Sequence, residues 1–110
     1  MTETINIFKV LDFIRDNAEA YAQAKAHLLY LTEFRKTKKA LLMIESDAKT
    51  ESGKESYAYA HDEYIEHLKA LAMALQESER LRWLMVGAEA KIEVWRSLEA
   101  SARLEVKSTT

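Results

Sequence analysis

The sequence contains no cysteine, no proline and only 2 glycines among its 110 residues. The absence of cysteine excludes disulfide bonds, thiolate metal sites and thiol nucleophiles. The absence of proline and the scarcity of glycine remove the usual helix breakers, and Ala, Glu, Lys, Leu and Arg dominate the composition, as is typical of long helices. We therefore expect an all-α fold in a single domain, residues 1–110.

The sequence also lacks long hydrophobic runs. Charged residues such as Lys9, Asp12 and Arg15 interrupt the apolar positions near the N-terminus, which is unlike the core of a signal peptide. No stretch approaches the roughly 18 consecutive apolar residues of a membrane span. We therefore expect a cytoplasmic protein without membrane partners, in the host cytoplasm if a phage encodes it.

Enzyme signatures are missing as well. The sequence has no nucleophile-elbow glycine pattern, no phosphate loop and no nucleotide-binding fingerprint. The segment HDEYIEH places Glu63 four residues before His67, a spacing that could share a metal ion, but helix capping and a Glu–His pair explain the same residues. We predict no catalytic residue, no metal site and no cofactor.

Apolar spacing predicts two long helices. The first covers about residues 5–48 with Thr4 as its N-cap, and a break at 16–17 would split off a short N-terminal third helix. The second covers residues 62–106, followed by a frayed tail at 107–110. Two such helices form a helical hairpin.

The segment 49–61 between the two helices is rich in polar residues and is predicted to be a loop. Ser52 and Glu55 would form a capping box for a helix that began early, at Gly53. Asp62, with acidic residues after it, suits a later start. We favour the later start.

The second helix is apolar around most of its surface between Leu81 and Trp95. A helix of this kind is normally covered from several sides, which two helices alone cannot provide. We therefore expect the hairpin to assemble into an oligomeric helical bundle or ring. The predicted interface residues are Leu81, Trp83, Leu84, Met85, Ile92, Val94 and Trp95.

A basic cluster lies in the first helix of a chain whose net charge is −2. Arg35, Lys38 and Lys39 share one helical face, and Lys36 lies about 100° away. Such charges bind phosphates, and neighbouring tyrosines can stack on exposed bases. A solvated helix face is the alternative. The predicted DNA-binding residues are Lys25, Arg35, Lys36, Lys38, Lys39, Lys54, Tyr57 and Tyr59.

The order of these features resembles that of the small all-helical recombination mediators of tailed phages, which load a recombinase onto single-stranded DNA. Basic residues lead into KKALLMIE, a polar loop with tyrosines follows, and the chain closes with LRWLMVGAEAKIEVWRSLEASARL. The likeness covers about residues 18–104 and extends to short phage proteins encoded among replication and recombination genes. This chain differs in its net acidity and its more compact loop.

The resemblance implies a homo-oligomer that is assembled by its C-terminal helices and holds the DNA backbone with its basic residues. It also implies a recombinase or a single-strand-binding protein as a partner. We therefore expect a non-enzymatic DNA-binding accessory protein of phage replication or recombination, without sequence preference. The alternative is a helical protein-interaction module, an adaptor or an inhibitor of a host enzyme, in which the acidic residues of 55–79 dock on a basic partner.

Overall fold

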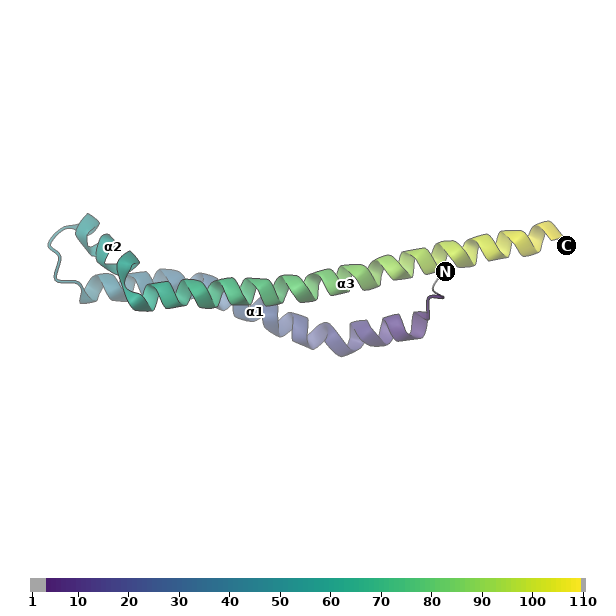
Figure 1. Ribbon diagram of the computed structural model, residues 1–110, viewed down its shortest axis with the longest axis horizontal. Helices are drawn as coiled ribbons and strands as arrows, with labels where there is room; N and C mark the ends of the chain where they lie inside the picture. The colour runs from purple at the N-terminus through teal and green to yellow at the C-terminus, as the bar shows by residue number, and fades with distance from the viewer. Residues whose placement is uncertain (1–3, 110) are drawn as a thin grey trace. The chain divides into compact units, whose positions relative to one another are not determined.

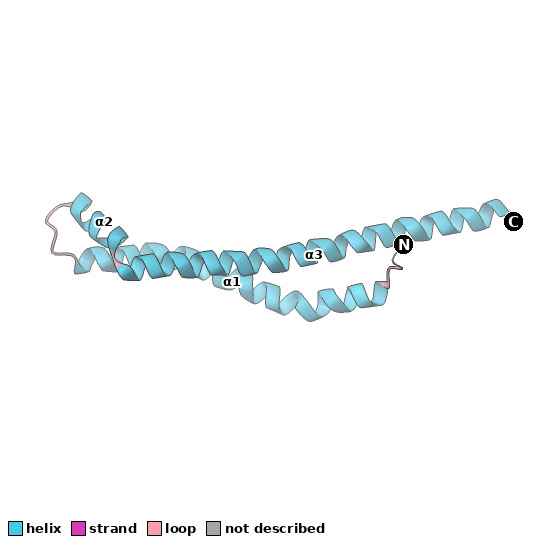
Figure 2. Cartoon of the chain, viewed as in Figure 1, coloured by secondary structure: helices cyan, strands magenta, loops and turns pink. Residues whose placement is uncertain are grey.

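A computed structural model describes residues 4–109 of the chain. It contains three helices, α1 (Ile7–Glu45), α2 (Glu51–Ala60) and α3 (Asp62–Thr109), shown in chain order in Figure 1. Figure 2 shows that helices and short connections make up the described residues, with no strand among them. The all-α prediction is confirmed.

Helix α1 begins at Ile7 and is continuous to Glu45. Asn6, and not Thr4, caps it, because the Asn6 side chain accepts a hydrogen bond from the Lys9 amide at 3.2 Å. The alternative of a break at 16–17 is wrong. The Asn17 side chain donates to the Phe13 carbonyl one turn earlier, at 2.8 Å, and therefore supports the existing helix instead of capping a new one.

The predicted loop at 49–61 is wrong for residues 51–60, which form α2. Thr50 is the N-cap of this helix, and its hydroxyl accepts a hydrogen bond from the Gly53 amide at 3.0 Å. The third helix therefore lies between the two long ones and not at the N-terminus. The predicted start of the second long helix at Asp62 is confirmed.

Helix α3 continues to Thr109, so the predicted fraying is not found at residues 107–109. Thr110 lies outside the described residues. The chain divides into two compact units, which we call the inner unit (Ala22–Glu79) and the terminal unit (the described residues up to Tyr21 and from Arg80 onward).

The inner unit is built around a small apolar cluster. Leu42 of α1 has only 1% of its surface exposed, and it packs with Ala58 of α2 and Tyr64 of α3. The ring Nε2 of His67 lies 2.7 Å from the Leu31 carbonyl oxygen, and Lys38 pairs with Glu63. Because residue numbers rise along α1 while they fall along α3, α1 and α3 are antiparallel in this unit.

In α3 the buried positions, together with the half-buried Leu71 and Met85 between them, recur with alternating spacings of three and four residues, the repeat of a coiled-coil seam. In the inner unit these positions are Tyr64, His67, Ala74 and Ser78. In the terminal unit they are Leu81 and Ala88, with Val10 as the buried residue of α1. The large residues at further seam positions of the terminal unit are only half-buried.

The predicted oligomer interface divides between two faces of α3. Leu81 is buried within its own chain, and Met85, Ile92 and Trp95 are half-buried at the same repeat positions. Trp83, Leu84 and Val94 are exposed, with 61% of Trp83 accessible to solvent. Only these last three present an uncovered apolar surface to a second molecule.

Candidate nucleic-acid interface

Three cations and two tyrosines from all three helices line one pocket in the inner unit. Its volume is about 280 Å³, and its lining residues are Arg35, Lys36 and Lys39 of α1, Tyr59 of α2 and Tyr64 of α3. Positive charge beside aromatic rings is the combination that proteins use to hold a nucleic-acid backbone and stack its bases. We call this group the cationic pocket.

Lys39 is positioned by two neighbours. Its Nζ lies 4.8 Å from the centre of the Tyr59 ring and 3.7 Å from a carboxylate oxygen of Glu55. The Tyr59 hydroxyl and then the Glu55 carboxylate raise the pKa of Lys39 above its ordinary value, although desolvation opposes them. Lys39 therefore remains a cation throughout the neutral pH range.

The two tyrosines of the pocket contact each other edge to face, with ring centroids 5.3 Å apart. Tyr64 is buried in the apolar cluster, whereas 47% of Tyr59 is exposed. The buried ring fixes the exposed one, so Tyr59 offers solvent an aromatic surface beside the three cations.

Lys38 does not line this pocket. It pairs with Glu63 at 3.9 Å and lies 5.9 Å from the centre of the Phe34 ring. Lys36, which the helical projection placed away from the shared face, lines the pocket in its stead. The face that was predicted for Arg35, Lys38 and Lys39 is therefore not the face on which the cations gather.

Tyr57 lies in different surroundings from Tyr59. Its ring packs against the His61 ring, with centroids 5.5 Å apart. Desolvation, followed by the negative charges of Glu45, Asp47 and Glu63, raises the pKa of Tyr57. Tyr57 therefore lies beside carboxylates and apart from the cationic pocket.

Two further predicted residues lie outside the cationic pocket. Lys25 is exposed on α1 and Lys54 is half-buried on α2, and neither is among the lining residues. Of the eight residues predicted to bind DNA, the structure thus brings together Arg35, Lys36, Lys39 and Tyr59.

A group of possible metal ligands lies where the three helices meet. Donor atoms of Glu45, His61 and Glu63 lie within 4.8 Å of one another. However, His61 Nδ1 accepts a hydrogen bond from the Glu63 amide at 3.0 Å, which uses one ring lone pair and places the proton of a neutral ring on Nε2. The Glu63–His67 pair considered from the sequence does not form such a group, because His67 is buried against Leu31 and Phe34.

Sequence reasoning missed two contributors to the site, Tyr64 as a lining residue and Glu55 as the partner of Lys39. The repeat spacing of Tyr64 with the other seam residues of α3 was a usable signal. Glu55 had none, because its position depends on α2, which was predicted to be loop.

Comparison of the chain with protein-family models, with curated proteins and with solved structures finds no match. Among the described residues, no helix combines the length and apolar character needed to cross a lipid bilayer. The site therefore has to be interpreted from its own chemistry.

Proposed function

We propose that this chain is a non-enzymatic DNA-binding accessory protein of phage replication or recombination, which holds the DNA backbone in the cationic pocket. The observation that carries the proposal is the convergence of Arg35, Lys36 and Lys39 with the exposed Tyr59 ring. A guanidinium can bind phosphate oxygens in a two-pronged manner, and the lysines add point charges. The setting in phage recombination comes from the resemblance in the order of elements.

Several copies are needed for this activity. One copy supplies three pocket cations from a chain of net charge −2, and non-specific DNA binding rests on the number of phosphates neutralised. When copies associate, the second and later contacts become intramolecular and gain effective concentration. The exposed apolar residues of α3 provide the surface for that association.

The test is fluorescence anisotropy with a labelled oligonucleotide over a series of salt concentrations. Changing Arg35, Lys36 and Lys39 together to Ala should weaken binding to all sequences alike. Each lost phosphate contact should reduce the slope of log affinity against log salt by about 0.7–0.9. If the wild-type protein binds no DNA even at low salt, the proposed function is wrong.

A matched control removes the same amount of charge elsewhere. Arg15 and Lys69 are exposed cations that pair with a neighbouring carboxylate on their own helix, and Lys49 is an exposed cation between α1 and α2; all three lie outside the pocket. Changing these three to Ala should leave most of the affinity intact. Equal losses in the two triple variants would show that overall charge matters and that the pocket does not.

Glu55 provides a test in the opposite direction. Its carboxylate faces Lys39 at 3.7 Å and competes with a phosphate for that cation. The substitution Glu55→Gln removes the competing charge while keeping a similar shape, and should tighten DNA binding. Unchanged or weaker binding would contradict a role for Lys39 in holding phosphate.

A protein-interaction module is the second candidate, because the inner unit also exposes large apolar side chains. Leu29, Leu41 and Ile44 of α1 and Met73 of α3 are all more than half exposed. Such residues suit a partner helix. If nuclease-treated protein binds no DNA but forms a stoichiometric complex with one host protein, this second function replaces the first.

A further inference from the structure

The terminal unit carries an open apolar groove between α1 and α3. It has a volume of about 390 Å³, with Val10 and Phe13 on one helix and Trp83 and Leu84 on the other. Gly87 also lines it, and a Cβ atom placed there would meet no atom within 4 Å. The groove therefore has room for a closely approaching helix.

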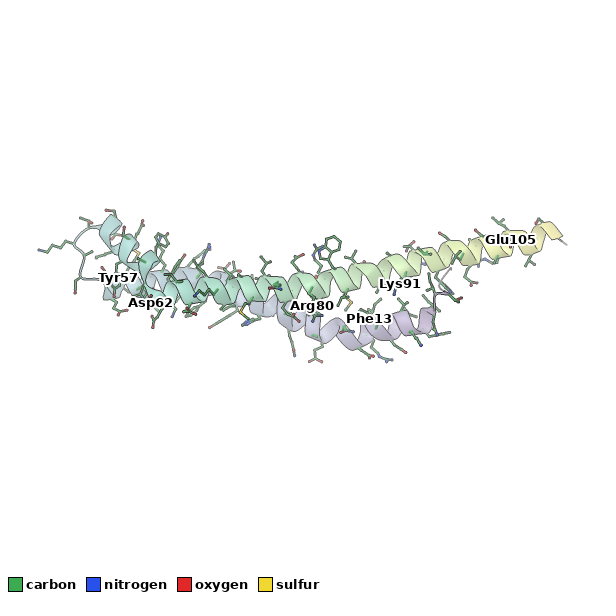
Figure 3. The ribbon with its side chains drawn as sticks, in the orientation of Figure 1. Phe13, Tyr57, Asp62, Arg80, Lys91 and Glu105 are labelled. Atoms are coloured by element: carbon green, nitrogen blue, oxygen red, sulfur yellow. The ribbon has the colours of Figure 1, made fainter. Side chains whose placement is uncertain are left out.

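The groove also contains positive charge. Lys9 of α1 and Lys91 of α3 are among its lining residues, and Figure 3 labels Phe13 and Lys91 on the two helices. Apolar walls with two cations fit an amphipathic helix that carries a carboxylate.

The last part of α3 is an exposed helix that carries both apolar side chains and carboxylates. Residues 96–108 are all exposed, although they include Leu98 at 57% exposure and Leu104 at 67%. An isolated helical segment of this length is marginal in water, so a covering surface is expected to stabilise it. The segment carries the carboxylates Glu99 and Glu105, the second labelled in Figure 3, and also three cations, Arg96, Arg103 and Lys107.

We infer that the segment 96–108 of a second copy of this chain occupies the groove, and that the pairing is reciprocal. The groove residues of α3 and the exposed segment follow each other on one helix, with the exposed Val94 between them. Two antiparallel α3 helices that cross near Val94 place each groove opposite the partner's segment. Both contacts are then made twice, as a two-fold interface requires.

The pairing also brings unlike charges together. In an antiparallel pair centred close to Val94, Glu99 of one copy lies opposite Lys91 of the other, on the side where Lys9 adds a second cation. Leu98, four residues beyond Val94 and on the same side of the helix, then lies opposite Ile92, at the Lys91 end of the groove. The inference rests on the proposed function, whose self-association it specifies.

The experiment is sedimentation equilibrium of the full chain without DNA. The wild-type mass should approach twice 12.7 kDa at micromolar concentration. The substitution Leu98→Lys should raise the dimer dissociation constant by about tenfold or more, since it places a positive charge beside Lys9 and Lys91 at the end of an apolar groove. The matched control Leu29→Lys changes a similarly exposed leucine of the inner unit and should leave the constant unchanged.

A charge exchange tests the orientation. Lys91→Glu and Glu99→Lys should each weaken the dimer severalfold, and the double variant should restore it to near the wild-type constant. A monomeric wild-type protein, a mass above that of a dimer, equal effects of the two leucine substitutions, or no rescue in the double variant would each overturn the inference. Failure of the proposed function would instead appear as lost DNA binding with the dimer intact.

Discussion

The inner and terminal units share one repeat of inward-facing positions along α3, but the side chains at these positions are buried to different degrees in the two units. In the inner unit, α2 packs over the antiparallel pair, and His67 and Lys38 form polar contacts with the other elements. In the terminal unit, only Val10, Leu81 and Ala88 are buried, and an open groove remains. The comparison shows that a two-helix pair leaves apolar surface uncovered in both units, because the inner unit also has an apolar groove between α1 and α3, lined by Leu28, Leu68 and Leu75 among others. A third helix covers only the part of the inner unit around Leu42.

The largest expected effect is the loss of the inner cluster. The substitution Leu42→Ala should lower the free energy of unfolding by about 2–5 kcal/mol, because it leaves a cavity between α1, α2 and Tyr64. The matched substitution Val10→Ala in the terminal unit removes fewer buried atoms and should cost about 1–2 kcal/mol. Urea unfolding followed by circular dichroism measures both, and equal losses would contradict the contrast between the units.

A smaller effect is expected at the buried histidine. His67→Ala removes the 2.7 Å hydrogen bond with the Leu31 carbonyl and the contact with the Phe34 ring. It should lower the free energy of unfolding by about 1–3 kcal/mol. The exposed His27 on α1 is the control, and His27→Ala should change that free energy by less than about 0.5 kcal/mol. Similar values for both variants would show that His67 contributes no specific contact.

Substitution of the two glycines should give the smallest changes in stability, and the changes should differ between the two units. In a monomeric variant, whose groove is empty, Gly87→Ala in the terminal unit should stabilise the chain by about 0.5–1 kcal/mol, because alanine is the better helix former and its methyl group meets nothing within 4 Å. At Gly53 in the inner unit, the new methyl group would lie 2.9 Å from the Thr50 hydroxyl that caps α2. Gly53→Ala should therefore give no gain or a loss. Thermal unfolding of the two variants tests this, and an equal gain at both positions would contradict the crowding at Gly53.

The sequence was sufficient to predict the two long helices, because their repeat spacing and lack of breakers act locally. It was insufficient for Asn17, whose side chain can either cap a new helix or bond back to the carbonyl at Phe13, and only the packed chain decides between them. Helices begin close to both candidate starts, since α2 begins at Glu51, two residues before the candidate Gly53, and α3 begins at Asp62. Choosing one of them removed α2 from the prediction.

The cationic pocket was predictable only in part, because its residue types are local features of the sequence whereas its geometry depends on contacts between distant residues. The residue types and their cluster at 35–39 are visible in the sequence, and so are the tyrosines. Which lysine faces the pocket depends on Glu55 and Glu63, two acidic residues distant in sequence that hold Lys39 and Lys38 on different sides. Helical projection treats a helix as isolated and so cannot include these long-range pairs.

The complete burial of Ala58 couples the pocket to the folding of α2. This helix has 10 residues, too few for stability in water, so it persists through the docking of Ala58 and its neighbours on α1 and α3. When α2 detaches, Tyr59 leaves Lys39 and the pocket ceases to exist, even if both long helices stay intact. Any anion bound there favours the docked helix by mass action. Amide hydrogen exchange across Glu51–Ala60 should therefore slow when an anion occupies the pocket, although this segment supplies only one side chain to the pocket lining.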